Sequence, residues 1–201
     1  MANSQNALII FIKNPEKGKV KTRLADSVGE DKALEIYEIL LNKTLEIVTN
    51  VNCKKFLYYS DKVVKEDKWN NNLFIKKLQK GNNLGERMLH AFSEVFAEDG
   101  IKNVAIIGSD CPSLPSTFIE KAFDELRYNS FVIGPAYDGG YYLLAMRALR
   151  YEIFEKIIWS GPYVLSDTLK KINKMVNTYY LLPALPDVDT LEDWELYKKS
   201  I

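Results

Sequence analysis

The sequence is poor in cysteine and histidine, and it has no long apolar run. Of its 201 residues, only Cys53 and Cys111 are cysteines and only His90 is a histidine. Two distant cysteines with no secretory leader ahead of them indicate reduced thiols and a cytoplasmic protein. The early run ALIIFI ends at Lys13 and is too short to cross a bilayer, so it predicts a buried strand. We expect neither a membrane span nor a disulfide framework.

The sequence also lacks a net charge. Lysine plus arginine and aspartate plus glutamate each total 27 residues, so the overall field does not favour nucleic acid or an anionic membrane. We therefore expect small molecules as partners. The charge is nevertheless uneven, with an early basic cluster of Lys13, Lys17, Lys19, Lys21 and Arg23, and a late acidic cluster of Asp187, Asp189, Glu192, Asp193 and Glu195. Such clusters are most often solvated surface, so motifs must decide whether these have a function.

A Walker A loop is missing as well. The segment FIKNPEKGKVKTRL follows the apolar run, but Gly18 is its only glycine, and Lys19 directly after it is followed by Val20 instead of the serine or threonine that a P-loop requires. Gly18 still permits a turn whose backbone amides face an anion, and Lys13, Lys21 and Arg23 carry the charge to neutralise phosphate. From this segment alone, a phosphate-binding loop and a solvated turn are equally good interpretations.

Hydrophobic periodicity predicts strands that alternate with helices in a single domain spanning residues 1–201. Strands are expected at residues 7–12, 55–60, 73–78, 104–107, 130–136, 141–146 and 178–183. Helices are expected at about residues 33–48, 84–96, 116–126, 151–158, 164–172 and 191–199. This alternation predicts an α/β fold with three α/β/α layers and a mostly parallel central sheet, in which ligands lie beyond the carboxyl ends of the strands.

Aspartates follow the strands where such a ligand would lie. Asp110, in GSDCP, comes directly after the most buried strand and is predicted to reach the ligand crevice, although a turn role would explain it if it stood alone. Asp187 and Asp189 are two residues apart, so they share one face of an extended segment. Mg²⁺ and Mn²⁺ prefer oxygen ligands and often combine a few carboxylates with substrate phosphates. Asp110 with Asp189 or Asp187 would provide such a site.

The stretch GPAYDGGYYLL places Asp138 at a turn between two strand-like runs. Gly139 after it can adopt positive φ and leaves room for a ligand ring or a phosphate. The Asp-Gly pair between apolar runs also predicts a β-hairpin, and the two interpretations are compatible.

Six motifs occur in the order and approximate spacing of a known family: KNPEKGKVKTRL, KGNNLGERM, IIGSDCPSLP, GPAYDGGYYLL, IIWSG and LPDVDTLEDW. Over nearly its whole length, the chain resembles small bacterial glycosyltransferases of the GT-A type, a family with members associated with arsenosugar biosynthesis. The resemblance implies a nucleotide-diphospho-sugar transferase fold, which sugar-phosphate and cofactor nucleotidyltransferases share. The chain departs from many relatives at Ser109, which stands in place of the first aspartate of an Asp-x-Asp motif.

The resemblance also implies roles for individual residues. Asp110 would bind a divalent metal, Mg²⁺ or Mn²⁺, and Asp189 would complete the metal site better than Asp187. Asp138 would contact the sugar or the second substrate and is a candidate general base. The implied nucleotide and phosphate contacts are Lys13, Gly18, Lys21, Arg23, Arg87 and Gly139.

The expected function is metal-dependent transfer of a glycosyl group from a nucleotide-diphospho-sugar to a small acceptor. A first alternative is nucleotidyl transfer, in which a nucleoside triphosphate joins a small phosphorylated acceptor and Lys21 and Arg23 stabilise the departing pyrophosphate. The basic loop favours this alternative on physical grounds, whereas the family resemblance favours sugar transfer. A second alternative is a nucleotide-binding protein without turnover, which the missing first aspartate makes reasonable.

Overall fold

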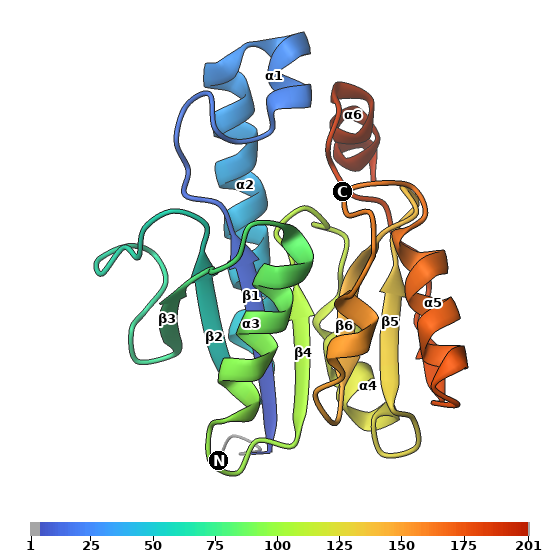
Figure 1. Cartoon of the computed structure of the whole chain (residues 1–201). Helices are drawn as coiled ribbons and strands as arrows, with labels where there is room; N and C mark the ends of the chain where they lie inside the picture. The colour runs from blue at the N-terminus through green and yellow to red at the C-terminus, as the bar shows by residue number, and fades with distance from the viewer. Residues whose placement is uncertain (1–4, 201) are drawn as a thin grey trace.

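The computed structural model describes residues 5–200, which form a seven-stranded sheet with helices on both faces (Figure 1). The strands are β1 (Asn6–Ile12), β2 (Lys54–Tyr59), β3 (Phe74–Leu78), β4 (Asn103–Ile107), β5 (Phe131–Pro135), β6 (Tyr141–Met146) and β7 (Tyr179–Leu181). The helices are α1 (Thr22–Val28), α2 (Glu30–Thr49), α3 (Leu84–Phe96), α4 (Ser116–Glu125), α5 (Val164–Lys174) and α6 (Leu191–Lys199), with a 3₁₀ turn η1 (Tyr151–Phe154).

The sheet is mostly parallel, as predicted. Its strand order is β3-β2-β1-β4-β6-β5-β7, and β6 alone runs antiparallel to its neighbours β4 and β5. The β5–β6 pair is the hairpin that the Asp-Gly signal predicts, with its turn at residues 136–140. All seven residues of β1 are buried, which explains why Ala7–Ile12 form a continuous apolar run at the middle of the sheet.

Two apolar layers cover the sheet and confirm the α/β/α architecture. Alternate side chains of β1 point to opposite faces, with Leu8 and Ile10 on one side and Ala7 and Ile9 on the other. The first face packs against buried residues of α2 and α4, and the second packs against residues of α3, η1 and α5. Figure 1 shows α3 in front of the sheet and α4 behind it.

A third apolar cluster lies beyond the carboxyl edge of the sheet. Leu24 of α1 packs with residues of α2 and with Val188 and Trp194 from the last segment of the chain. Helices α1 and α6 therefore stand together at the edge where β1 and β4 end (Figure 1). The cluster brings the early basic segment next to the late acidic segment, although they are separated by nearly the whole chain.

Two segments differ from the periodicity-based expectation. Helix α1 is not among the expected helices, because it is only seven residues long and its N-cap has no side-chain hydrogen bond. Residues 151–158 are expected to be helical, but only the four residues of η1 are. The chain leaves helical geometry at Lys156, which has φ +50°. The indole of Trp159 then packs directly on Gly85, where an added Cβ would lie 2.2 Å from Nε1 of Trp159. Within residues 5–200, no helix combines the length and apolarity needed to cross a membrane.

Candidate functional site

The carboxyl ends of β1 and β4 open onto a cleft of about 540 Å³, a volume typical of small-molecule sites. The loop before α1, the loop after β4 and the segment before α6 all contribute to it. Six of the nine predicted site residues line the cleft: Lys13, Lys21, Arg23, Arg87, Asp110 and Asp189. The alternative metal ligand Asp187 lines it as well.

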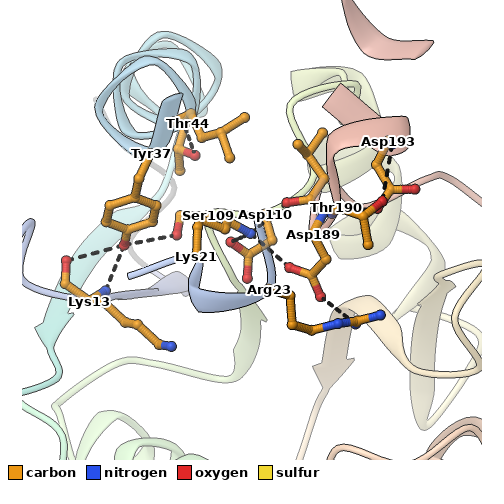
Figure 2. A network of polar contacts seen from close by, with 12 residues as sticks. Lys13, Lys21, Arg23, Tyr37, Thr44, Ser109, Asp110, Asp189, Thr190 and Asp193 are labelled. Carbon is orange, nitrogen blue, oxygen red and sulfur yellow. Dashed lines mark hydrogen bonds and ion pairs between the residues drawn. The ribbon is translucent and has the colours of Figure 1, made fainter. Parts of the chain in front are cut away.

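Lys21 lies at the centre of the acidic end of this cleft (Figure 2). Its side chain is only 5% exposed, and its Nζ contacts Asp110 Oδ1 at 2.5 Å and Asp189 Oδ1 at 2.9 Å. The same Nζ donates a hydrogen bond to the Val188 carbonyl oxygen at 2.6 Å. Burial alone lowers the pKa of Lys21, but the two carboxylates outweigh it and raise the pKa above its ordinary value. The ammonium is therefore charged, and each of its three N–H groups has an oxygen acceptor.

The start of α6 positions Asp189. Asp193 Oδ2 accepts hydrogen bonds from the backbone N–H groups of Asp189 at 3.1 Å and Thr190 at 2.8 Å, while Thr190 Oγ1 accepts from the Asp193 N–H at 3.3 Å. This is a capping box, which explains why the segment turns into a helix at Thr190. The Val188 N–H donates to the Asp110 carbonyl oxygen at 2.8 Å, so the two acidic segments are also joined through their backbones.

Asp187 carries negative charge into an environment that is already acidic. Burial raises its pKa, and the nearby carboxylates of Asp110, Asp138 and Asp189 raise it further, to about 7, against the opposing effect of Lys21. The guanidinium of Arg23 lies 3.7 Å from Asp189 Oδ2, so Lys21 and Arg23 provide two positive charges against the three carboxylates that line this end of the cleft. An added cation would be favoured here electrostatically.

Tyr37 of α2 connects the ends of the two strands that frame the site (Figure 2). Its hydroxyl accepts a hydrogen bond from the Lys13 N–H at 2.8 Å and donates one to the Lys13 carbonyl oxygen at 3.1 Å. It also lies 3.3 Å from Ser109 Oγ, so the residue that replaces the first aspartate of Asp-x-Asp takes part in this buried network. Burial raises the pKa of Tyr37, which keeps its hydroxyl neutral.

Only part of the early basic cluster faces the cleft. Lys17 Nζ lies 2.7 Å from Asp31 Oδ1, and Lys19 Nζ lies 2.7 Å from Glu16 Oε2, and neither lysine lines the cleft. Gly18 between them forms a turn with φ +76° and is also outside the cleft lining. The other three members of the cluster line the cleft, where Arg87 of α3 joins them.

Asp138 and Gly139 lie on the β5–β6 turn and do not line the cleft. Asp138 is exposed, and its Oδ1 accepts a hydrogen bond from the Gly140 N–H at 2.8 Å, which stabilises the turn. Gly139 has φ +89°, and a Cβ there would lie 2.0 Å from the Pro162 carbonyl oxygen. Close packing and the backbone conformation thus account for this glycine, and its contact with a substrate stays a prediction.

Two residues that the motif analysis does not single out hold the site in shape. Asn14 Oδ1 accepts from the N–H groups of Asp61 at 3.0 Å and Lys62 at 3.2 Å, and its amide donates to the Lys62 carbonyl oxygen at 2.8 Å. Gln79 Nε2 donates to the carbonyl oxygens of Ile12 at 3.0 Å and Tyr58 at 3.1 Å. The position of Asn14, two residues after the first strand, could have marked it as a site residue, whereas nothing in the sequence marks Gln79.

The side chains at the acidic end suit a divalent cation in chemistry but do not enclose one. Asp110, Asp187 and Asp189 present carboxylate oxygens, which Mg²⁺ and Mn²⁺ prefer. Burial raises the pKa of Asp187, and the neighbouring carboxylates raise it further. Within residues 5–200, no three aspartate, glutamate, histidine or cysteine side chains converge closely enough to hold a metal by themselves. The arrangement suits an ion that one or two of these carboxylates share with substrate phosphates.

Comparison with known proteins identifies the family. Residues 44–161 match the family DUF2064, described as an uncharacterized protein conserved in bacteria, and the chain belongs to this family. A solved structure from Desulfovibrio desulfuricans G20, provisionally described as a nucleotide-diphospho-sugar transferase, is 32% identical with a TM-score of 0.88. That match covers 98% of this chain and 87% of the other. Among curated proteins, no sequence matches the chain.

More distant structures share the fold. The 4-diphosphocytidyl-2C-methyl-D-erythritol synthase of Anaerococcus prevotii is 13% identical with a TM-score of 0.61, over 98% of this chain and 96% of the other. Rv0371c of Mycobacterium tuberculosis, solved in complex with manganese, is 11% identical with a TM-score of 0.56, over 98% of this chain and all of the other. The comparisons confirm the expected family and fold, and the 32% identical structure, which is described as a transferase, supports the expectation of a transferase.

Proposed function

We propose that this protein is a metal-dependent transferase that moves a glycosyl group from a nucleotide-diphospho-sugar to a small acceptor. The observation that carries the proposal is that cationic and acidic side chains line one and the same cleft. Lys13, Arg23 and Arg87 provide positive charge, while Asp110 and Asp189 provide carboxylates beside them. A diphosphate bound with a divalent ion needs both kinds of group.

The chain's own residues would divide the work as follows. Lys13, Arg23 and Arg87 would bind and orient the phosphates, because their cationic groups complement phosphate oxygens and an arginine can bind bidentately. Asp110 and Asp189 would hold the metal, with Asp187 next to them. A bound divalent ion would stabilise the negative charge that develops on the departing nucleoside diphosphate.

Deprotonation of the acceptor hydroxyl is assigned to Asp138, as the family resemblance implies. The Asp138 carboxylate is exposed and hydrogen-bonded to its own turn, so it is accessible to an acceptor that approaches from the β5–β6 side. Its influence on the pKa of Asp187 indicates that it lies near the acidic end of the cleft.

Nucleotidyl transfer is the second candidate, and a specific observation favours it. The three exposed or partly exposed cationic side chains at the cleft suit a triphosphate whose departing pyrophosphate must be stabilised. The fold is also shared with the Anaerococcus prevotii synthase, whose name describes a diphosphocytidyl product. The two candidates differ in the leaving group, which is a nucleoside diphosphate in one reaction and pyrophosphate in the other.

Thermal unfolding with a panel of nucleotide sugars and nucleoside triphosphates, each with and without Mn²⁺, tests the proposal first. A ligand at about a hundred times its dissociation constant adds about 2.7 kcal/mol, which shifts the melting temperature measurably. We expect a nucleotide sugar to stabilise the protein most, and only with metal. Asp110→Asn should abolish the metal-dependent part, whereas the matched control Lys17→Met, a lysine outside the cleft, should not.

Product analysis with the stabilising ligand then separates the three functions. Release of a nucleoside diphosphate in the presence of an acceptor supports glycosyl transfer, and release of pyrophosphate supports nucleotidyl transfer instead. Metal-dependent binding with no release over many hours would favour a nucleotide-binding protein without turnover and would contradict the proposed activity.

A further inference from the structure

We propose that Lys21 is a positioning residue that holds the carboxylates of Asp110 and Asp189 in place for the metal, and that it is not a phosphate ligand. This inference rests on the proposed function and deepens it, because motif resemblance alone assigns Lys21 to phosphate.

The contacts of Lys21 leave its ammonium no donor for a substrate. Its three N–H groups are matched by Asp110 Oδ1, Asp189 Oδ1 and the Val188 carbonyl oxygen, all within 2.9 Å. The side chain is 5% exposed, so a phosphate could reach the ammonium only by displacing these acceptors. Arg23 lies in the same cleft, with Nη1 3.7 Å from Asp189 Oδ2, but at 71% exposure its guanidinium still presents donors to a phosphate.

The exposure of the three side chains shows on which side a cation would approach. Asp110 and Asp189 are 50% and 41% exposed, whereas Lys21 is almost fully covered. The ammonium therefore lies behind the carboxylates, on the protein side, and the carboxylates face the cleft. Lys21 takes one oxygen of each carboxylate and leaves the other oxygen of Asp110 without a partner among the described residues.

The backbone of Lys21 also indicates a demanding role. Lys21 is in the left-handed conformation, with φ 46° and ψ 46°, at the N-cap of α1. This conformation is unfavourable for a residue with a Cβ and persists only where the surrounding contacts compensate for it. Here the compensation comes from three contacts with residues 89 or more positions away, which join three separate segments of the site. A surface phosphate ligand would need no such arrangement.

Binding of Mn²⁺ alone and of inorganic pyrophosphate in metal-free buffer tests this inference without any turnover. Supporting residues behind metal ligands typically contribute about 10-fold to 100-fold to metal affinity. We expect Lys21→Met to weaken Mn²⁺ binding at least about tenfold by this principle and to leave metal-free pyrophosphate binding within about twofold of the wild type. Lys13→Met, the matched control, removes an exposed lysine of the same cleft and should show the opposite pattern.

Lys21→Arg keeps the test decisive if Lys21→Met does not fold. The guanidinium retains the charge, but its planar fork cannot place a single nitrogen among the three oxygens, so Mn²⁺ affinity should again fall. Weaker pyrophosphate binding with unchanged Mn²⁺ affinity would overturn the inference and make Lys21 a phosphate ligand. Tighter Mn²⁺ binding in Lys21→Met would overturn it by showing that lysine and metal compete, and so would a wild type that binds no Mn²⁺ at millimolar concentrations. None of these three results identifies the group that is transferred, which analysis of the released product identifies separately.

Discussion

Replacing Gly139 with alanine tests whether packing requires this glycine. A Cβ at Gly139 would lie 2.0 Å from the Pro162 carbonyl oxygen and 2.7 Å from its carbonyl carbon, distances that real Cβ atoms do not reach. The obstacle is backbone, so no side-chain rotation relieves it. The turn is also held by the Leu165 N–H, which donates to the Gly139 carbonyl oxygen at 2.9 Å. Moving the turn would therefore disturb the first turn of α5.

Gly100 provides a matched control for the size of the effect. It has φ +81°, close to the +89° of Gly139, but no atom lies within 4 Å of its Cβ position. Gly100→Ala should therefore cost only the backbone term, about 1–2 kcal/mol. In Gly139→Ala, the steric overlap adds about 1–3 kcal/mol by analogy with overpacked cores. For a chain of this size, each kcal/mol lowers the melting temperature by about 2–4 °C.

Equilibrium unfolding in urea of the wild type and both variants, without ligand, measures these differences. We expect both variants to unfold at lower urea concentration and Gly139→Ala to be clearly the less stable of the two. If Gly139→Ala loses no more stability than Gly100→Ala, the close contact with Pro162 does not constrain the turn and the reasoning is refuted. A stable Gly139→Ala that fails to bind donor would instead support the predicted substrate contact.

Two further changes test the polar network. In metal-free buffer, Asp187→Asn should equal the wild type in stability near pH 4 and exceed it by about 1–2 kcal/mol at pH 8. This gain is smaller than the whole pKa shift would give, because the Asp187 side chain is partly exposed to solvent. The pKa of Asp187 in the folded protein, about 7, lies above that of a carboxyl in the unfolded chain, so the wild type loses stability as the pH rises from the unfolded to the folded pKa. Urea unfolding at pH 4 and pH 8 measures the difference. A stability advantage of Asp187→Asn that is smaller at pH 8 than at pH 4 would contradict this reasoning. Tyr37→Phe should destabilise by about 1–3 kcal/mol, because the part-buried Lys13 N–H and the buried Ser109 hydroxyl lose a partner. A loss below about 0.5 kcal/mol in the same assay would argue against that network.

Much of the architecture could be predicted from the sequence because the buried strands leave a strong pattern. The run before Lys13 and the run Val104–Ile107 are apolar at every position, since both strands are covered on both faces. Parallel strands place their carboxyl ends at one edge, so the position of Asp110 directly after a buried strand was enough to assign it to the crevice. Helix α1 could not be predicted in this way, because its stability comes from packing Leu24 against distant residues rather than from local signals.

The arrangement within the site was harder to foresee. Sequence reasoning groups Lys21 with Arg23 as phosphate contacts, because both are cationic and close together. It cannot show that the ammonium of Lys21 is buried between two carboxylates while the side chain of Arg23 is 71% exposed, since the burial of Lys21 depends on the distant segment that contains Asp189. The raised pKa of Asp187 likewise comes first from burial and then from carboxylates that include Asp110 and Asp138 on distant segments, and spacing along the chain reveals only its neighbour Asp189.

The contacts of Lys21 also have a consequence for the order in which the protein matures. Its acceptors Val188 and Asp189 follow it by 167 and 168 residues, after every strand of the sheet. During synthesis, the sheet and most helices are available before these acceptors leave the ribosome. Until then, Asp110 is the acidic partner of Lys21 that is already present, and the cluster of Leu24 with Trp194 is incomplete. The cleft can therefore be completed only after the segment that contains Val188 and Asp189 has been synthesised and has packed against α1.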